Sequence, residues 1–156
     1  MLKNINFIII CMFSCCSYAS QKLEHGPFHI KSTNTSIEFV RKKDESIDFV
    51  SDTNNKIDVV DTYQVGDGVP KIDTVFFSVV KDINNIVVLV SWDEENISAV
   101  HYKIYLYTYS ESGRINRNDG VMVDRNFEGY DGYSGNGMVF NYKDAADIKK
   151  YLSQLK

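Results

Sequence analysis

The residues best suited to chemistry lie in a glycine-rich segment, residues 124–137, which holds four glycines, three acids and three aromatics in fourteen positions. Segments of this length without regular structure are usually functional or mobile. Aromatic side chains would anchor a partner, acids would pair with its cationic groups, and glycines would allow close backbone approach. The candidate binding residues of the segment are Asp124, Phe127, Glu128, Tyr130, Asp131 and Tyr133. The alternative is that the glycines only turn the chain between two short strands.

The same segment resembles the start of an EF-hand calcium loop. Oxygen-bearing side chains stand at alternate positions, Asp124, Asn126 and Glu128, and Gly129 follows. The twelfth position, which should supply a bidentate glutamate, is Gly135, and no helix is expected on either side. An acidic, hydrated loop is therefore favoured, no metal or other cofactor is predicted, and calcium binding by residues 124–137 stays open.

Hydrolytic chemistry has weaker support. Carboxylate pairs for glycoside hydrolysis could be assembled from Glu94, Glu95, Glu128 and Asp131, but 21 acids make such pairs available by chance. His101 lies in a predicted strand, away from any G-x-S-x-G turn. A non-enzymatic function is predicted, and a carboxylate-dependent hydrolase is kept as an alternative.

Residues 99–109 form the longest predicted strand, and their side chains alternate between two faces. One face is apolar and predicted to be core: Val100, Tyr102, Ile104 and Leu106. The other carries His101, Lys103, Tyr105, Tyr107 and Tyr109. Tyrosine is favoured in interfaces, so Tyr105, Tyr107 and Tyr109 join the candidate binding residues. The alternative, ordinary aromatic packing within a sheet, is favoured somewhat more.

The predicted centre of the fold is a β-hairpin, formed by apolar runs at 74–80 and 86–92 with the polar turn 81–85 between them. Both runs are apolar on both faces, so the hairpin should lie mid-sheet and be covered above and below. Further strands are expected at 37–41, 47–50, 57–65, 114–118, 121–123 and 138–140, while residues 20–35 should be irregular. A C-terminal helix over 144–155, capped by Asn141 or Asp144, carries an apolar stripe.

These elements predict an α+β fold, in which a single, meander-rich antiparallel sheet of about six to eight strands has the C-terminal helix packed on one face. Residues 20–156 would form one domain. Residues 1–19 read as a cleaved signal peptide, because one lysine precedes a short apolar run and small residues precede Ala19. Lipoprotein processing at Cys15 or Cys16 is the alternative. The prediction is a periplasmic or secreted protein without a membrane span.

The net charge and the positions of the cysteines exclude some classes of partner and chemistry. The formal net charge is −4 and no basic stretch occurs, so nucleic acid is a poor partner and a cationic one fits better. All three cysteines lie in the predicted signal segment, which excludes thiol chemistry in the mature chain.

Three stretches, residues 63–70, 89–92 and 129–133 ahead of the C-terminal helix, resemble small exported bacterial proteins of the periplasmic immunity or inhibitor type. In size and β content the chain also resembles periplasmic lysozyme inhibitors, although its predicted mature part lacks their cysteines. The resemblance implies a protein that binds and neutralises a toxin or a cell-wall-degrading enzyme, whose binding cleft would be basic. A small-ligand or glycan binding module is the alternative in another class.

Overall fold

The computed structural model describes residues 22–132 and 138–155, so the predicted signal peptide and Tyr133 lie outside the described residues. The strands are β1 (Lys22–His29), β2 (Thr35–Arg41), β3 (Ile47–Thr53), β4 (Lys56–Tyr63), β5 (Pro70–Val80), β6 (Ile83–Glu94), β7 (Ala99–Tyr109), β8 (Ile115–Arg117) and β9 (Glu128–Asp131). The α-helices are α1 (Asp119–Met122) and α2 (Ala145–Leu152), and short 3-10 turns occur at Glu95–Ile97 (η1) and Arg125–Phe127 (η2). None of the helices in this part of the chain has the length and apolar character needed to cross a membrane.

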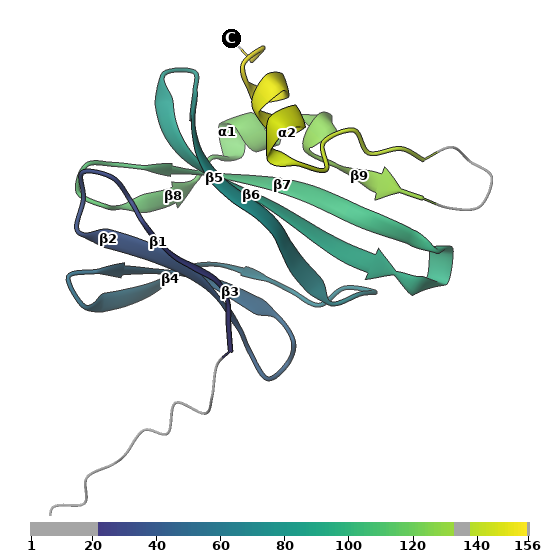
Figure 1. Cartoon of the computed structure of the whole chain (residues 1–156), viewed down its shortest axis with the longest axis horizontal. Coiled ribbons are helices and arrows are strands. Elements are labelled where there is room, and N and C mark those ends of the chain that lie inside the picture. The colour runs from purple at the N-terminus through teal and green to yellow at the C-terminus, as the bar shows by residue number, and fades with distance from the viewer. Residues whose placement is uncertain (1–21, 133–137, 156) are drawn as a thin grey trace, which may run out of the picture.

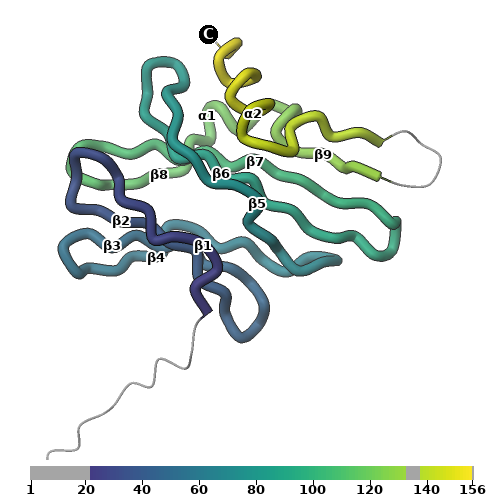
Figure 2. The backbone as a smooth tube through the Cα atoms, in the orientation of Figure 1, coloured from purple at the N-terminus to yellow at the C-terminus, as the bar shows by residue number. Residues whose placement is uncertain are grey.

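The structure is mostly β, with nine strands in two separate antiparallel sheets among the described residues, so the predicted α+β fold with a single sheet is wrong. The first sheet has the order β1-β2-β3-β4; the second has the order β5-β6-β7-β8, with β9 also pairing with β7. The two sheets form separate layers in Figures 1 and 2. The break falls between β4 and β5, where the chain passes from one sheet to the other without the two strands pairing. Alternation along a strand shows which residues share a face, but it does not show what covers that face.

The first core lies between the two sheets. Phe39 and Phe49 of the first sheet stack with ring centroids 4.8 Å apart, and Phe49 meets Tyr107 of the second sheet edge-on at 4.9 Å. Strand β6 contributes Ile86, Val88, Val90 and Trp92 to this layer. The face of β7 that carries tyrosines is therefore the face that packs on the first sheet, because aromatic side chains fill the space between two sheets well.

The second core lies on the opposite face of the second sheet, beneath α2 (Figure 1). Ile148 and Leu152 of α2 are buried there. The Asp144 side chain accepts hydrogen bonds from the backbone N–H groups of Ala146 and Asp147, which confirms one of the two predicted caps. The predicted C-terminal helix is confirmed, but it ends at Leu152 rather than at residue 155.

The predicted hairpin is confirmed, but it lies at the edge of its sheet rather than mid-sheet, and its turn is shorter than predicted. Val80 pairs with Ile83, so the turn is only Lys81 and Asp82, both with positive φ (50° and 61°). This is the backbone that a two-residue hairpin turn requires. Strand β6 is covered on both faces, as expected of an apolar run, whereas β5 is an edge strand with several exposed positions.

Three local predictions are wrong. Residues 22–29, expected to be irregular, form β1, which pairs with β2 through two register shifts and contains a cis Gly26–Pro27 bond. Residues 121–123, expected to be a strand, lie mostly in α1, and residues 138–140 form no strand. Phe140 is instead buried in the second core, so its apolar character reflects packing rather than strand formation.

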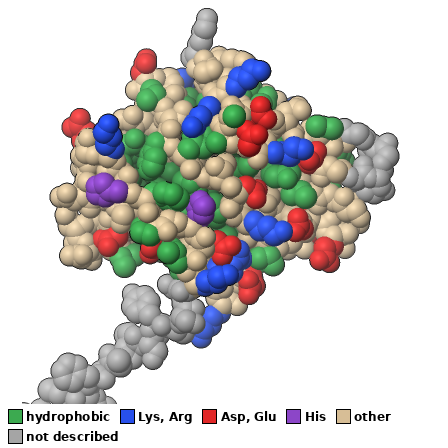
Figure 3. Space-filling model, in the orientation of Figure 1, with side chains coloured by type: hydrophobic (Ala, Val, Ile, Leu, Met, Phe, Trp, Pro, Cys, Tyr) green, Lys and Arg blue, Asp and Glu red, His purple; other side chains and the backbone are tan. Residues whose placement is uncertain are grey.

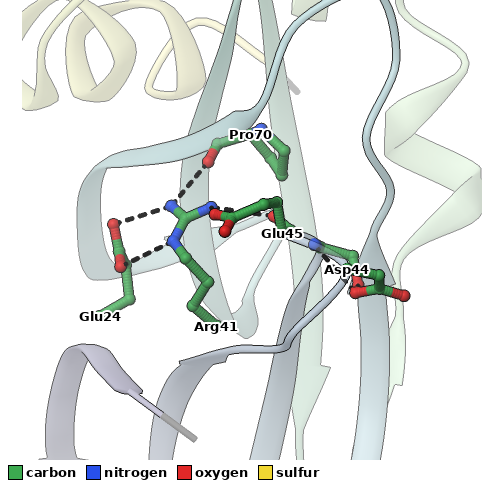
Figure 4. Close-up of polar contacts among 6 residues, drawn as sticks. Glu24, Arg41, Asp44, Glu45 and Pro70 are labelled. Carbon is green, nitrogen blue, oxygen red and sulfur yellow. Dashed lines mark hydrogen bonds and ion pairs between the residues drawn. The ribbon is translucent and has the colours of Figure 1, made fainter.

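Arg41 ties the first sheet to the start of the second (Figure 4). Its guanidinium donates two hydrogen bonds to the Glu24 carboxylate, at 3.1 and 2.9 Å, and one to the Pro70 carbonyl at 2.9 Å. It also donates to the Glu45 carbonyl at 2.9 Å. The planar fork of arginine can satisfy several acceptors at once, so this single side chain links β1, β2 and β5.

Candidate binding cleft

A cleft of about 290 Å³ opens beside the connection between β4 and β5, where it meets β7 and β9. Its chemically distinctive lining residues are Trp92, Glu94, His101, Lys103, Tyr105 and Glu128. These side chains come from three neighbouring strands of the second sheet, β6, β7 and β9.

The register of these strands places three aromatic rings in one row. Trp92 pairs with His101, and His101 pairs with Tyr130. The His101 ring stacks on Tyr130 with centroids 4.7 Å apart, and it lies 5.3 Å from the indole of Trp92. The Trp92 indole N–H donates to the Gln64 carbonyl at 2.9 Å, which fixes the ring. Directly opposed residues on adjacent strands are close enough for such contacts.

His101 lies between two carboxylates. Its Nε2 is 3.0 Å from Oε1 of Glu128, and its Nδ1 is 3.8 Å from Oε1 of Glu94. Glu128 also pairs with Lys103, whose Nζ lies 2.6 Å from Oε2. The imidazole therefore has a defined orientation, with a hydrogen-bonding group on one side and a nearby acid on the other.

The two carboxylates have pKa values shifted in opposite directions. Burial raises the pKa of Glu128, but the hydrogen bond and charge of Lys103, with His101, outweigh burial and leave the pKa below its ordinary value. Burial and the neighbouring Asp67 carboxyl raise the pKa of Glu94, against the opposing effect of His101. Glu128 is therefore the more firmly ionised of the two acids.

Tyr105 supplies a neutral hydroxyl to the cleft. Burial, with the charges of Asp61 and Glu128, raises its pKa well above the ordinary value, so the phenol stays protonated. Lys103 and Arg117 lie over the ring at 5.7 and 5.8 Å from its centroid. Within the described ranges, its hydroxyl makes no hydrogen bond to the protein, so this donor is available to a ligand.

Of the nine predicted binding residues, Tyr105 and Glu128 line the cleft, and Tyr130 lies beside it, stacked on the lining residue His101. Phe127 is only 2% exposed and packs edge-on against Tyr151 in the second core. Tyr107 has no exposed surface, because it fills the space between the sheets. Phe127 and Tyr107 are therefore interior residues and not binding residues. For Tyr107, the alternative given above, aromatic packing, is the correct one.

Tyr109 lies at the far end of β7, eight residues from His101 and hence about 27 Å away. The acids Asp124 and Asp131 already have partners. Asp124 accepts from the Asn126 backbone N–H and the Tyr151 hydroxyl, which lower its pKa, the Tyr151 contact most. Asp131 forms an ion pair with Lys143, which lowers the pKa of that carboxyl. Both acids therefore hold the fold locally.

The oxygen ligands proposed for calcium are separated by these contacts. Asp124 is bound to Asn126 and Tyr151, whereas Glu128 faces His101 and Lys103. Over residues 22–132 and 138–155, no three His, Cys, Asp or Glu side chains are grouped so that they could hold a metal ion.

Sequence reasoning missed Trp92 and Lys103 as members of the site, and it placed Glu94 only in a generic pool of acids. Trp92 ends an apolar run and is itself buried in the first core, so its type indicated packing rather than a site. The pairing of β7 with β9 spans 27 residues between His101 and Glu128. The one usable signal was the face shared by His101, Lys103 and Tyr105 on β7. Comparison of the chain with protein-family models, with curated proteins and with solved structures finds no match.

Proposed function

We propose that this chain is a non-enzymatic binding protein that neutralises a protein partner, a toxin or a cell-wall-degrading enzyme, by accepting one of the partner's side chains in the His101 cleft. The observation that carries the proposal is the row of Trp92, His101 and Tyr130, flanked by Glu128. Pockets walled by aromatic rings, with a few placed polar groups, are the usual centres of binding energy in protein interfaces.

The cleft is held in shape before any partner arrives. Internal contacts fix His101, Glu128 and Lys103, so little side-chain freedom remains to be lost on binding. Tyr130 is 39% exposed although it is stacked on His101, and it presents a fixed aromatic surface beside the cleft. Rigid aromatic surface with nearby hydrogen-bonding groups favours a binding role.

A cationic side chain is the preferred occupant. Glu94 and Glu128 both present carboxylates at the cleft, the Tyr105 hydroxyl can accept as well as donate, and the chain carries a net charge of −4. Acidic and basic side chains are interspersed over the face in Figure 3, so recognition of a partner's charge would depend on such local groups. Binding to a basic partner cleft should weaken as salt concentration rises.

The location of this activity is part of the proposal. A signal peptide over residues 1–19 would deliver the mature chain to the periplasm or the exterior, where toxins and wall-degrading enzymes act. The absence of cysteine from the mature chain is compatible with an oxidising compartment.

The test is a pull-down with the purified protein, against periplasmic extract and the products of neighbouring genes, followed by titration of the isolated partner. Tyr130→Ala and Glu128→Gln should each weaken binding about tenfold or more, and Tyr109→Ala is the matched control at the distant end of β7. The partner's toxic or wall-cleaving activity should fall in proportion to the complex formed. Full affinity in both cleft variants, with the fold intact, would remove the cleft from the proposal.

A second candidate is a carboxylate-dependent hydrolase, favoured by the position of His101 between Glu94 and Glu128. A raised pKa on one acid and a lowered pKa on the other are suited to an acid and a base, respectively. Release of soluble fragments from purified cell wall would support this candidate if Glu94→Gln abolished it. If the purified protein alone released no fragments from the cell wall, the result would favour the binding protein over the hydrolase.

A further inference from the structure

A second concave surface lies at the opposite end of the sandwich from the His101 cleft. The turns that join β1 to β2, β3 to β4 and β7 to β8 meet there, on the left in Figures 1 and 2. Two hollows of about 540 and 360 Å³ adjoin, because both are lined by Ser32, Thr33 and Glu111. We refer to them together as the turn-end groove.

The base of the turn-end groove is closely packed. The hydroxyls of Thr35 and Thr53 are hydrogen-bonded at 2.8 Å. Gly113, in the turn between β7 and β8, packs so closely on Thr35 that a side chain at position 113 would overlap the Thr35 hydroxyl. Ile30 is fully buried, and its carbonyl accepts a hydrogen bond from the Thr33 hydroxyl at 2.8 Å. The turns of the two sheets are therefore locked together, which reduces the entropy lost when a ligand binds.

The rim of the groove carries hydrogen-bonding side chains that the protein does not use. The residues are Ser32, Asn34, Asn54, Asn84 and Tyr109, and in the described part of the chain their side chains form no hydrogen bond with other protein groups. Four of the five are exposed, and Tyr109 is half-buried. Each amide offers both donors and acceptors, and each hydroxyl offers both.

The charged and aromatic side chains of the groove indicate which chemical class of ligand it would bind. Lys31 and Glu111 contribute one charge of each sign, and His29 is the remaining basic side chain of the lining, so the groove does not present a cluster of charges of one sign. The Tyr109 ring is held edge-on by Phe77, with centroids 5.9 Å apart, and offers an apolar surface among the amides. Hydroxyls, amides and one aromatic face together complement a sugar ring, which is polar at its edge and apolar on its face.

We propose that the turn-end groove binds a neutral oligosaccharide, with Tyr109 packing against a sugar ring while Asn34, Asn54 and Asn84 bond its hydroxyl or acetamido groups. This site is separate from the His101 cleft and does not depend on the function proposed for it. A binding protein with both sites would hold a glycan and a protein partner at the two ends of one sandwich.

The test is calorimetric titration of the purified protein with two neutral probes, N-acetylglucosamine tetrasaccharide and maltotetraose. Binding of at least one probe is expected, and Tyr109→Ala and Asn84→Ala should each weaken it about tenfold. Binding of only the acetylated probe would assign the amides to its acetamido groups, and equal binding would assign them to ring hydroxyls. Tyr130→Ala is the matched control and should bind the sugar like the wild type.

Two outcomes overturn the proposal: no heat of binding from either probe at about 10 mM, or binding that both groove variants leave unchanged. The Asn84 side chain is exposed, so its variant remains informative even if Tyr109→Ala weakens packing against Phe77. The two functional proposals fail independently, because the groove variants should leave binding of a protein partner intact.

Discussion

Replacing Tyr107 with phenylalanine should destabilise the protein by about 2 kcal/mol while leaving its shape intact. The Tyr107 hydroxyl lies 3.0 Å from that of Tyr63 and donates to the Asp61 carboxylate at 2.7 Å. Burial raises the pKa of Tyr107 far above its ordinary value, so this donor stays protonated at every pH of interest. Phenylalanine keeps the aromatic packing and removes only these two bonds.

The magnitude follows from the partners left behind. Loss of a neutral hydrogen bond costs about 0.5–1.5 kcal/mol, and loss of one to a charged group costs about 1.5–3 kcal/mol. Tyr63 is only 1% exposed and would keep an unpaired hydroxyl. The Asp61 side chain is 22% exposed, so water can replace part of what it loses, and a total near 2 kcal/mol is expected.

The assay is urea unfolding followed by fluorescence of Trp92, the single tryptophan, for the wild type, Tyr107→Phe and Tyr109→Phe. Tyr109→Phe is the matched control, because its hydroxyl bonds to no protein group in the described chain, and it should stay within about 0.5 kcal/mol of the wild type. If the two variants are equally stable, the tyrosine face of β7 is not buried between two sheets and the sandwich arrangement is refuted.

Two further predictions concern the turns and the acid stability. Gly113→Ala should cost more than about 1 kcal/mol in urea unfolding, because φ is +81° and the methyl group would overlap Thr35, whereas Gly120→Ala, which has open space, should not destabilise. Glu24→Gln should lower the free energy of unfolding by about 1 kcal/mol at neutral pH. The hydrogen bond from Arg41 lowers the pKa of Glu24 below its ordinary 4.5, so this stabilisation is complete above that value and is lost as pH falls through the folded-state pKa. The wild type and Glu24→Gln should therefore converge in stability once the pH is below the folded-state pKa of Glu24, and a constant difference across the acid range would contradict the assignment.

Sequence patterns predicted a strand or helix correctly where the spacing of apolar residues fits only one kind of element. Strand β7 has the bounds predicted for it, because strict alternation over residues 99–109 has no helical explanation. The cap at Asp144 and the apolar stripe of α2 follow from helical spacing in the same way. Residues 121–123 and 138–140 were too short for periodicity to distinguish a strand from buried irregular chain.

The arrangement of strands could not be predicted, because pairing is long-range. The tyrosine face of β7 packs on the first sheet only because the chain starts a new sheet after Tyr63, and no local signal separates this from one continuous meander. The cleft was missed for the same reason. His101, Glu128 and Trp92 meet through the register of three strands, and register depends on the whole fold.

Site-specific photo-crosslinking from position 130, with position 57 as the control, would show whether a protein partner binds at the His101 cleft. Tyr130 borders the cleft, whereas Ile57 is 61% exposed on the edge strand β4 of the other sheet. A photoreactive phenylalanine at position 130, in the protein expressed in living cells, should capture one protein partner that position 57 does not, and Glu128→Gln should reduce the yield. Equal capture from both positions, or a yield from position 130 that Glu128→Gln does not change, would contradict the claim that the His101 cleft binds a protein partner.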